Sequence, residues 1–574
     1  MKNQLIIDIF NKIADILEIL GENPFKPIAY RKAVRSIEAL GMDIEDFLKE
    51  HHLSEIPGVG KAMQEKISEI LKTGELQYLK RLEEKVPDGL LQILAIPGVG
   101  PKKTALFYKK LGIKTIEELK QACIQHRLRD LKGLGPKLEE NILRAIENLD
   151  LEHKRILLHR ALQHANGIVE YLKRHKDVIR ISPAGSVRRW KETIGDIDIL
   201  VSAKVSQGIM DMVVNYEDVK EVIAKGETKT SIILRDGVQV DVRVVNDDSF
   251  GSALQYFTGS KEHNVKLRTL ARKKGLKINE YGVFKQEDDT PIPGAGKEEE
   301  KTYAAVGLPY IPPELREDTG EIEAALEGRL PVLVERKDIK GDLHIHSNWS
   351  DGRNSIEEIA VFARDVFGYE YIAIADHSES ERIGNGLNRE RRLAQIKEIE
   401  NLNDSIDGIK IFKSIEVNIL PDGSLDASED VLEKLDFAVA AVHSQFKMVR
   451  KEMTERVVAA LQHPKVKMLA HPFARRIYQR EPIELDFEKV VEAAVSNKVA
   501  IEINSCPDRL DLDWSRVKKA REDGVLFAVC TDAHNLPSLE MISLGLSVAR
   551  RGWLEKRHVL NTMPLKEVEK WLKE

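Results

Sequence analysis

The stretch AGSVRRWKETIGDIDIL, residues 184–200, decides how the rest of the chain is interpreted. Asp196 and Asp198 are separated by one residue, and on a β-strand residues i and i+2 share a face. Both carboxylates therefore point the same way and can hold the same hard cation. Asp241 lies in a second alternating run, residues 237–244, and joins the pair if that run forms a neighbouring strand. These three residues are the predicted catalytic carboxylates and the predicted ligands of two Mg²⁺ or Mn²⁺ ions.

A turn made by Gly185 and Ser186 precedes the acidic pair by nine residues and follows a predicted strand, residues 178–181. A Gly-Ser turn at the start of a helix lets backbone N–H groups come close to a phosphate. The alternative, two exposed aspartates on an edge strand, accounts for most Asp-x-Asp pairs but not for the turn or for the distal Asp241. The three features together favour nucleotidyl transfer from a triphosphate.

The order Gly-Ser, nine residues, Asp-x-Asp and a distal Asp is similar to that of the polymerase β-like nucleotidyltransferase superfamily. The stretch Tyr256-Phe257-Thr258-Gly259-Ser260 resembles family X DNA polymerases in particular. The resemblance implies that the partners are gapped or primer-template DNA and dNTPs, with Ser186 and Arg189 at the β- and γ-phosphates and Arg268 at the template minor groove. The residues that it places at the dNTP are Gly185, Ser186, Arg189, Tyr256, Phe257, Gly259, Asn264 and Arg155. Arg155 lies on a long helix expected over residues 151–173, and a solvated surface charge is the competing interpretation for it. Arg268 and Arg243 are expected at the DNA.

Residues 1–150 read as helices joined by short turns, and three turns share the pattern Gly-x-Gly before a helix. The glycines permit a tight hairpin, and the helix that follows presents free N–H groups that bind a DNA phosphate without reading sequence. One copy would be explained equally well by an ordinary helix connector, whereas three copies predict a helix-hairpin-helix DNA-binding module. The third is the weakest, because Lys132 replaces the proline of the other two. The glycines are Gly58, Gly60, Gly98, Gly100, Gly133 and Gly135.

A basic cluster with an aromatic residue, formed by Lys26, Tyr30 and Arg31, is also expected to contact DNA. The region resembles the small N-terminal domain of DNA polymerase β, which binds a 5′-phosphate in a gap and in which a lysine forms a Schiff base with an abasic sugar. Lys66 falls on that position and is the candidate for DNA binding and for lyase chemistry. Ala62 stands where the family has a companion lysine, so a surface lysine is the competing interpretation.

The last third of the chain begins with Asp342-Leu343-His344-Ile345-His346, and the short apolar runs that follow end in His, Asp or Glu. Seven β–α units of this kind predict a barrel with its site at the carboxyl ends of the strands. One such histidine alone would be interpreted as structural. Together they predict a centre for two or three Mn²⁺, Zn²⁺ or Fe²⁺ ions that activates water against a phosphoester. Asp342 and Asp376 are expected to support ligand histidines from behind. The predicted ligands are His344, His346, Asp351, His377, Glu416, His443, His471, Asp532 and His534.

The order of these ligands is similar to that of the PHP (polymerase and histidinol phosphatase) domain, a distorted (β/α)₇ barrel with a three-metal centre. Together with the palm motif, it resembles bacterial and archaeal family X polymerases over nearly the whole chain. The resemblance implies a gap-filling repair polymerase with 3′–5′ exonuclease and, in some members, abasic-site endonuclease activity. Two alternatives remain: a PHP phosphoesterase whose front half is regulatory, and a non-catalytic scaffold for DNA ends.

Composition sets the remaining limits. The chain has 574 residues, 42% of them hydrophobic and 32% charged, which predicts several soluble domains. No run is long and apolar enough for a membrane span, and the N-terminus is an amphipathic helix, so we expect a cytoplasmic, monomeric protein that does not bind membranes. The net charge of −6 means that DNA contacts come from local basic patches. The three cysteines are too scattered for a disulfide framework.

The predicted organisation is multidomain. It comprises an all-α N-terminal DNA-binding domain (1–82), a helix-hairpin-helix subdomain of fingers type (83–150), an α+β nucleotidyltransferase palm (151–249), a thumb-type subdomain that binds the nascent base pair (250–317), a linker (318–340) and the PHP barrel (341–574).

Overall fold

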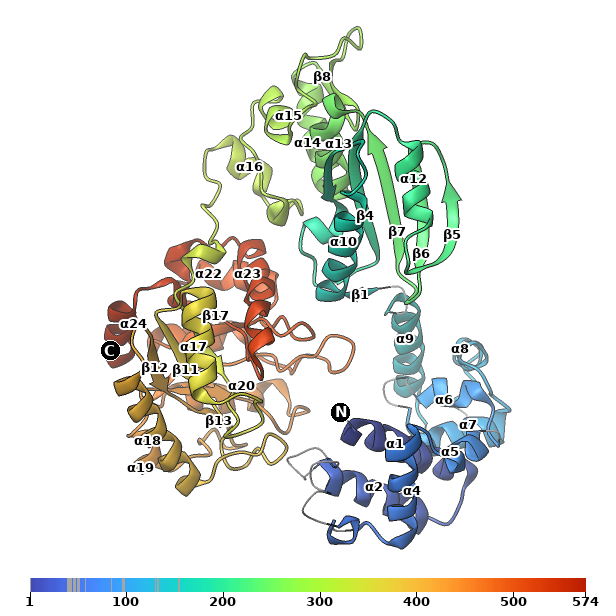
Figure 1. Ribbon diagram of the computed structural model, residues 1–574, viewed down its shortest axis with the longest axis vertical. Coiled ribbons are helices and arrows are strands. Elements are labelled where there is room, and N and C mark those ends of the chain that lie inside the picture. Colours follow the sequence, from blue (N-terminus) through green and yellow to red (C-terminus); the bar gives the residue numbers. More distant parts are fainter. Residues whose placement is uncertain are drawn as a thin grey trace. The chain divides into compact units, whose positions relative to one another are not determined.

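The computed structural model describes residues 2–38, 52–56, 58–83, 85–94, 99–129, 134–152 and 155–574, together with residues 44, 48, 96 and 131. The chain divides into two compact units, Met1–His153 and Lys154–Glu574, and each is considered by itself (Figure 1). None of the helices in the described residues has the length and apolar character needed to cross a membrane.

The first unit is helical, as its sequence predicts. The long apolar face of α1 fills its core, where Ile6, Phe10 and Ile13 are completely buried. This helix packs against α2, α4, α5 and α7, so the amphipathic N-terminus forms the centre of a helical domain. The helices are α1 (Lys2–Leu20), α2 (Phe25–Glu38), η1 (Leu53–Glu55), α4 (Lys61–Thr73), α5 (Gln77–Glu83), α6 (Asp88–Leu94), α7 (Pro101–Leu111), α8 (Ile116–Ile124) and α9 (Pro136–Glu152).

The second unit begins with a five-stranded sheet in the order β2-β4-β7-β6-β5. Strands β4 and β7 are parallel, and the other neighbours are antiparallel. Ile197, Ile199 and Val201 of β4 pack in the core with α10 and α12, which leaves the alternate residues for the opposite face. The elements are α10 (Leu158–Leu172), β2 (Val178–Pro183), α11 (Gly185–Arg188), β4 (Asp196–Ala203), α12 (Gln207–Val214), β5 (Val219–Lys225), β6 (Lys229–Leu234) and β7 (Gln239–Val245).

The long helix expected over residues 151–173 is wrong. Helix α9 ends at Glu152, and the chain then forms β1 (Ile156–Leu157) before α10 starts at Leu158. Strand β1 pairs with β3 (Thr193–Ile194). Arg155, expected on this helix, instead donates from Nε to Thr193 Oγ1 at 3.0 Å. Residues 156 and 157 therefore pair with β3 and do not continue α9 into a single long helix.

Residues 247–340 belong to the same unit. Residues 318–340, expected to be a linker without regular structure, contain a helix whose Ile322 and Ala325 are buried beside Leu267. Glu321 at its start is fully buried, with Oε1 2.6 Å from His263 Nδ1. The tertiary core therefore overrides the local glycine and proline signals. The elements are η2 (Asp247–Ser249), α13 (Phe250–Thr258), α14 (Lys261–Lys273), β8 (Leu276–Asn279), β9 (Gly282–Lys285), α15 (Glu299–Ala305), η3 (Pro313–Leu315), α16 (Glu321–Leu326) and η4 (Arg336–Asp338).

Residues 341–574, here called the C-terminal region, contain parallel strands in two sheets, β10-β11-β12 and β13-β14-β15-β16-β17. Parallel bridges from Ile345 to Ala533 and from His377 to Glu416 bring the sheets together at both sides. One hydrophobic cluster contains a side chain from every strand except β13, so the strands surround a common core. The strands are β10 (Gly341–Ile345), β11 (Tyr371–Ile374), β12 (Lys410–Lys413), β13 (Glu416–Asn418), β14 (Ala438–Ala441), β15 (Val466–Leu469), β16 (Ala500–Asn504) and β17 (Phe527–Cys530).

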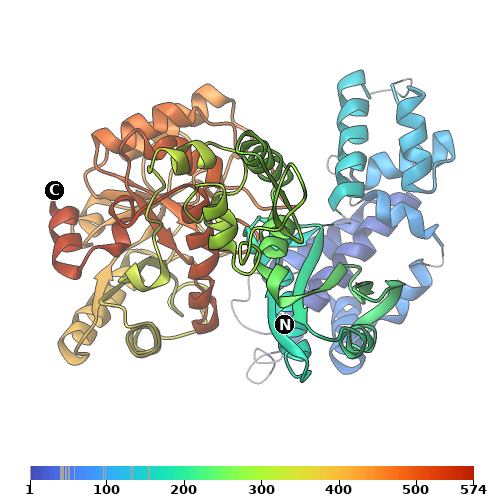
Figure 2. The same cartoon turned by 90° about the horizontal axis from the view of Figure 1, so that it is seen from above.

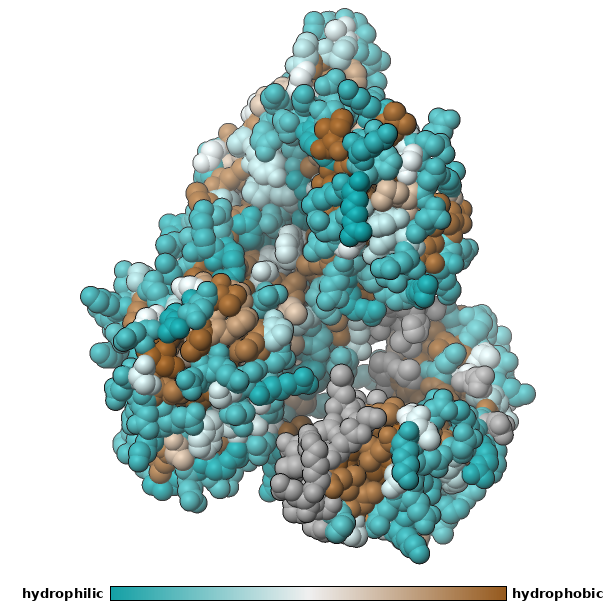
Figure 3. Space-filling model, in the orientation of Figure 1, coloured by the Kyte–Doolittle hydropathy of each residue, from teal (hydrophilic) through white to brown (hydrophobic). Residues whose placement is uncertain are grey.

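Helices connect these strands and lie around them in Figure 2. The apolar run 409–415, expected as one strand that leads to Glu416, forms β12 over residues 410–413, and a separate strand, β13, begins at Glu416 itself. The helices and 3₁₀ turns are α17 (Ile356–Phe367), α18 (Arg389–Ser405), α19 (Glu429–Leu432), α20 (Arg450–Leu461), α21 (Phe487–Ser496), α22 (Trp514–Arg521), η5 (Leu536–Met541), α23 (Ile542–Arg551), η6 (Lys556–His558), η7 (Leu560–Thr562) and α24 (Leu565–Lys573). The face drawn in Figure 3 is mostly hydrophilic, with apolar side chains in separate groups.

Candidate functional site

The Gly185-Ser186 turn lies directly against the acidic strand. Gly185 begins α11 with φ of +57°, a left-handed conformation that favours glycine. A Cβ atom at this position would lie 2.2 Å from Asp198 Oδ2. The N–H of Ala184 donates to the carbonyl oxygen of Asp198 at 2.8 Å. The turn and the Asp198 carboxylate are therefore in direct contact, and a side chain at residue 185 would displace Asp198.

The three predicted catalytic carboxylates come from the parallel pair β4 and β7. Asp198 is the direct neighbour of Asp241 in the register of this pair, and Asp196 lies two residues before Asp198 on the same face. Burial, together with the charges of Asp196 and Asp241, raises the pKa of Asp198 to about 7. A divalent cation would relieve this repulsion, so the carboxylates fit the metal site that the sequence predicts.

Asp241 differs from Asp198 because its charge already has partners. Lys229 Nζ lies 2.6 Å from its Oδ2, and Gln239 Nε2 donates to its Oδ1 at 3.1 Å. Burial opposes ionisation, but these groups and Ser231 outweigh it and hold the pKa of Asp241 below the usual range. In the protein without metal, Lys229 therefore supplies the positive charge that a cation would otherwise provide.

A pocket of about 360 Å³ opens beside Asp196 and Asp198. Seven of the eight residues predicted at the dNTP line it, whereas Arg155 does not. Lys261, which the sequence reasoning missed, also lines it; its place directly after the Gly259-Ser260 turn was the available signal. The lining residues are Gly185, Ser186, Arg189, Asp196, Asp198, Tyr256, Phe257, Gly259, Lys261, Asn264 and Arg268.

Helices α13 and α14 form the far wall of this pocket. Asn264 Nδ2 donates to the carbonyl oxygen of Tyr256 at 2.7 Å, and Asn264 Oδ1 accepts from Gln255 at the same distance. Arg268 Nε donates to the carbonyl oxygen of Asn264 at 3.2 Å. Asn264 thus holds the Tyr256 backbone in place. Arg243, predicted at the DNA, lies outside the pocket lining and stacks on Phe257, with its guanidinium 4.6 Å from the ring centroid.

Arg189 is buried at the edge of the pocket. Its Nη1 donates to the carbonyl oxygen of Thr258, and its Nε lies 3.1 Å from Glu317 Oε1. A Cβ atom on Gly259 would come within 3.2 Å of Nη1, so the glycine allows this close approach. The guanidinium is therefore fixed before any ligand arrives.

The nine predicted metal ligands of the C-terminal region meet in one centre, most of which is buried, with Asp351 exposed at its edge. Three sets of residues bring potential ligand atoms within 4.8 Å of one another, and His346, His377 and Glu416 each belong to two of the sets. Asp532 and His471 complete the group, with Asp532 Oδ1 3.2 Å from His346 Nε2 and His471 Nε2 2.9 Å from Glu416 Oε1. The palm carboxylates are not among these sets. The sets are His346, Asp351, His377 and His534; His344, His346 and Glu416; and His377, Glu416 and His443.

Glu416 lies at the middle of this centre and is 1% exposed. Burial opposes its ionisation, but the imidazoles of His443, His377 and His344 outweigh burial and hold its pKa well below the usual range. Nδ1 of His346 and Nδ1 of His471 are buried without a hydrogen-bond partner in the described part of the chain. Unpaired imidazole nitrogens beside ionised carboxylates fit bound transition-metal ions.

Glu502, the third residue of β16, is a supporting residue that was not among the predicted site residues. Its Oε1 lies 2.8 Å from His344 Nδ1, and its Oε2 accepts from the backbone N–H of His471 at 2.6 Å. Asp342 supports His344 as expected, but by accepting from its backbone N–H at 3.1 Å, and neither Asp342 nor Asp376 accepts from a ligand imidazole in the described part of the chain. Asp342 accepts from Thr531 Oγ1 at 2.5 Å, and Asp376 accepts from Ser347 Oγ at 2.5 Å. Both carboxylates instead fix the loops at the strand ends.

The glycine turns of the helical unit precede helices as expected. Gly60 and Gly100 are the N-caps of α4 and α7. Gly135 precedes α9, and a Cβ atom on any of these three glycines would meet nothing within 4 Å. The helix N-termini are therefore open to a ligand at their first turns. Gly58 has φ of +81° and packs on Lys32. Gly98 and Gly133 lie outside the described residues.

The basic cluster predicted near the N-terminus is only partly on the surface. Tyr30 is buried, with its ring 5.3 Å from that of Phe10, because its position faces α1. Lys26 pairs with Glu22 at 2.8 Å, and Arg31 pairs with Asp15 at 2.7 Å. Lys66 Nζ donates to the carbonyl oxygen of Ala62 at 3.1 Å and lies 5.0 Å from the Tyr78 ring centroid.

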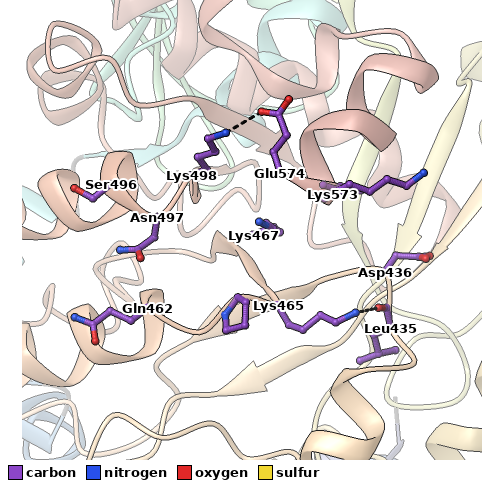
Figure 4. Close-up of a pocket in the computed structure, with 12 residues that line it drawn as sticks. Leu435, Asp436, Gln462, Lys465, Lys467, Ser496, Asn497, Lys498, Lys573 and Glu574 are labelled. Carbon is purple, nitrogen blue, oxygen red and sulfur yellow. Dashed lines mark hydrogen bonds and ion pairs between the residues drawn. The ribbon is translucent and has the colours of Figure 1, made fainter.

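A hollow of about 710 Å³ lies at the amino ends of the strands of the C-terminal region, where none of the predicted site residues is found (Figure 4). Lys467, the second residue of β15, is 8% exposed and has no hydrogen-bond or ion-pair partner in the described part of the chain. Burial and the charge of Lys498 lower its pKa. The residues around it are Leu435, Asp436, Gln462, Pro464, Lys465, Ser496, Asn497, Lys498, Leu572, Lys573 and Glu574.

Three family models match parts of the chain. A helix-hairpin-helix domain matches residues 1–76, and a SAM-like helix-hairpin-helix tandem matches residues 90–148. The DNA polymerase beta thumb matches residues 253–317. The prediction of helix-hairpin-helix modules is thereby confirmed, and so is the resemblance of the segment that begins near Tyr256 to family X polymerases.

Three curated proteins share larger parts of the sequence. The chain is 39% identical over 578 residues to the DNA polymerase/3′-5′ exonuclease PolX of Bacillus subtilis (strain 168), with 100% of each chain covered. It is 28% identical over 305 residues to DNA polymerase lambda of Arabidopsis thaliana, which covers 49% of this chain and 54% of that protein. It is 28% identical over 244 residues to a probable phosphatase of Thermoanaerobacter sp. (strain X514), which covers 40% of this chain and 94% of the phosphatase.

Proposed function

Because the chain belongs to the PolX family of DNA polymerase/3′-5′ exonucleases, we propose that it fills short gaps in DNA during repair and removes nucleotides from 3′ ends. Synthesis takes place at the palm carboxylates. Hydrolysis takes place at the histidine-rich centre of the C-terminal region, which we infer to be a distorted (β/α)₇ barrel of the PHP type.

The observation that carries the polymerase proposal is the composition of the 360 Å³ pocket. It places two carboxylates, a Gly-Ser turn at a helix start, an aromatic pair and two arginines around one space. Carboxylates suit divalent ions, the turn and Arg189 suit phosphates, and the aromatic pair and Asn264 suit a sugar and a base. A nucleoside triphosphate is the ligand class that needs all of these groups together.

Divalent ions held by Asp196, Asp198 and Asp241 would lower the pKa of the primer 3′-hydroxyl and offset the charge of the triphosphate and the departing pyrophosphate. The chain itself positions the reactants. The N–H groups of the Gly185-Ser186 turn and the Arg189 guanidinium receive the β- and γ-phosphates. The Tyr256 carbonyl is held by Asn264, which fixes the surface against which the sugar lies. Lys229 keeps Asp241 ionised until the ions bind.

The exonuclease proposal depends on the histidine-rich centre of the C-terminal region. Its three sets of closely spaced ligands fit two or three Mn²⁺, Zn²⁺ or Fe²⁺ ions, which would supply activated water at a phosphodiester. Glu502 orients His344 through Nδ1 and leaves Nε2 for an ion. The probable phosphatase that aligns with 40% of the chain supports phosphoester hydrolysis as the chemistry of this region.

The helical unit is proposed to hold the DNA on either side of the gap. Gly60, Gly100 and Gly135 leave helix N-termini open, which suits contacts to phosphates without sequence preference. Lys66 is the proposed contact to a 5′-phosphate. Its Nζ is hydrogen-bonded to Ala62 and stacked near Tyr78, so lyase chemistry would require this contact to break.

Two other functions are weaker. A phosphoesterase with a regulatory front half would have no need for a pocket that combines Asp198, Arg189 and Tyr256. A scaffold for DNA ends would have no need for buried, mutually repelling carboxylates at one site and unpaired imidazoles at the other.

One assay distinguishes these functions. The full chain is given a duplex with a one-nucleotide gap, dNTPs and Mn²⁺, and wild type is compared with Asp241→Ala and His344→Ala. We expect Asp241→Ala to lose extension and keep 3′ degradation, and His344→Ala to show the reverse. Extension by Asp241→Ala at the wild-type rate would refute the polymerase site, and unchanged 3′ degradation by His344→Ala would refute the exonuclease site.

A further inference from the structure

The last residue of helix α23 in the C-terminal region reaches the wall of the nucleotide pocket. Arg551 is 2% exposed, and its Nη1 donates to the backbone carbonyl oxygen of Arg189 at 2.5 Å. The same Nη1 lies 3.1 Å from Glu317 Oε1, and this oxygen lies 3.1 Å from Arg189 Nε. A single carboxylate oxygen thus joins an arginine of the pocket to an arginine of the C-terminal region.

These contacts leave part of the Arg189 guanidinium for a ligand. Its Nε is engaged by Glu317 and its Nη1 by the carbonyl of Thr258. Its Nη2 has no hydrogen-bond partner among the residues that the structure describes, and Arg189 lines the pocket. An arginine fixed at two nitrogens presents the third in one orientation, which favours phosphate binding by reducing the entropy lost on binding.

The charges around Glu317 do not balance. Two guanidiniums share its carboxylate, and Lys191 Nζ lies 3.9 Å from Oε2, so positive charge is in excess beside the pocket. If Arg551 were replaced by a neutral residue, Glu317 would keep only Arg189 and the more distant Lys191, and the excess would fall by one charge. The Arg189 backbone would also lose the donor that holds its carbonyl. Both changes make the pocket less suited to a polyphosphate.

The neighbouring residue on the same helix provides an internal comparison. Arg550 Nε donates to Glu314 Oε1 at 2.7 Å, and its Nη1 donates to the carbonyl oxygen of Val334 at 3.0 Å. It therefore links α23 to the same part of the chain that carries Glu317, but makes no contact with Arg189. Arg550 therefore only attaches α23 to residues 314–334, whereas Arg551 also holds Arg189. Comparing variants of the two distinguishes these two effects.

We propose that Arg551 is a positioning residue for nucleotide binding, through which the C-terminal region holds Glu317 and Arg189 in the geometry that receives the triphosphate. This proposal rests on the function proposed above for the pocket. The region that carries the hydrolytic centre would thus also determine the geometry of the nucleotide-binding pocket used in synthesis.

The test compares Arg551→Met with Arg550→Met in the full chain. Binding of the complementary dNTP to a gapped duplex with a dideoxy-terminated primer gives the Kd, and gap filling with a normal primer gives KM and kcat. We expect Arg551→Met to raise the Kd and KM for dNTP about tenfold, a typical effect of losing a charge-assisted hydrogen bond. Arg550→Met should stay within about twofold. Arg551→Lys should recover part of the affinity, because lysine keeps the charge without the second donor group.

Degradation of 3′ ends is measured on the same samples to show that the C-terminal region is folded. If Arg551→Met does not fold, Arg551→Lys takes its place and should still raise the Kd above that of Arg550→Met, because one ammonium cannot replace both guanidinium contacts. Equal dNTP affinity in Arg550→Met and in the Arg551 variant that folds overturns the positioning role. A separate variant, Arg189→Met, tests the pocket itself: unchanged dNTP affinity there would refute the proposed function, whereas a loss there without a loss at Arg551 refutes this inference alone.

Discussion

The contact between Gly185 and Asp198 allows a quantitative test of the synthetic site. In Gly185→Ala, the new Cβ atom would lie 2.2 Å from Asp198 Oδ2, whereas ordinary contacts begin near 3.4 Å. The carboxylate must therefore move by roughly 1 Å. Displacements of this size in catalytic groups cost about a hundredfold in rate. The φ of +57° adds a backbone strain of about 1 kcal/mol for alanine.

Gly294→Ala is the matched control. Gly294 has φ of +72°, and a Cβ atom there would meet nothing within 4 Å. Both variants should therefore lose about 1 kcal/mol of stability through backbone strain. Only Gly185→Ala should lose gap filling about a hundredfold.

The assay is single-turnover extension of a gapped duplex, with urea unfolding of each variant measured in parallel. Degradation of 3′ ends should be unchanged in both variants, because neither glycine lies in the second centre. If Gly185→Ala extends the primer as fast as Gly294→Ala, then Asp198 does not need the position that the turn gives it, and the reasoning is refuted.

Three further predictions concern other parts of the molecule. Glu502→Gln should weaken metal binding at the second centre about 10–100-fold and slow 3′ degradation while gap filling is unchanged, because His344 loses its acceptor; unchanged metal affinity by titration would contradict this role. Glu139→Gln should destabilise the turn before α9 by about 2 kcal/mol at pH 7, measured by hydrogen exchange, because Arg129 and buried backbone N–H groups hold the pKa of this carboxyl low. A lowered carboxyl pKa stabilises the fold above the unfolded value, so the difference from wild type should vanish as the pH falls through the folded pKa. Lys467→Met should raise the free energy of unfolding at pH 7 by about 1 kcal/mol, because burial and the charge of Lys498 disfavour the charged ammonium and lower its pKa. The gain should fade as the pH approaches the ordinary lysine value of 10.5, and a loss of stability at pH 7 would contradict this expectation.

Local pattern was enough to predict the elements that carry the palm carboxylates. The alternation of apolar and acidic residues around Asp196 and Asp198 required a strand, and the structure has β4 there. The run around Asp241 was also a strand, and its pairing with β4 follows from the need to bring the carboxylates together. The strand-end histidines were predictable for the same reason, since parallel strands place their carboxyl ends at one edge.

Contacts between residues distant in sequence were not predictable. Nothing near Glu317 indicates that Arg551, more than two hundred residues later, shares its carboxylate with Arg189. The strand at Ile156 depends on pairing with residues 193–194, so the helical pattern around it gave the wrong element. Glu502 stands within a strand, and only the closed arrangement of strands brings it to His344.

The ion pairs that α23 makes with residues 314 and 317 have a consequence for engineering. Cutting the chain near residue 340 to obtain a polymerase without nuclease would also remove Arg550 and Arg551, and would leave Glu314 and Glu317 without them. The shortened protein would be judged a poor polymerase for a reason unrelated to its own active-site residues. A single substitution such as His344→Ala, which keeps α23 in place, is the cleaner way to separate the two activities.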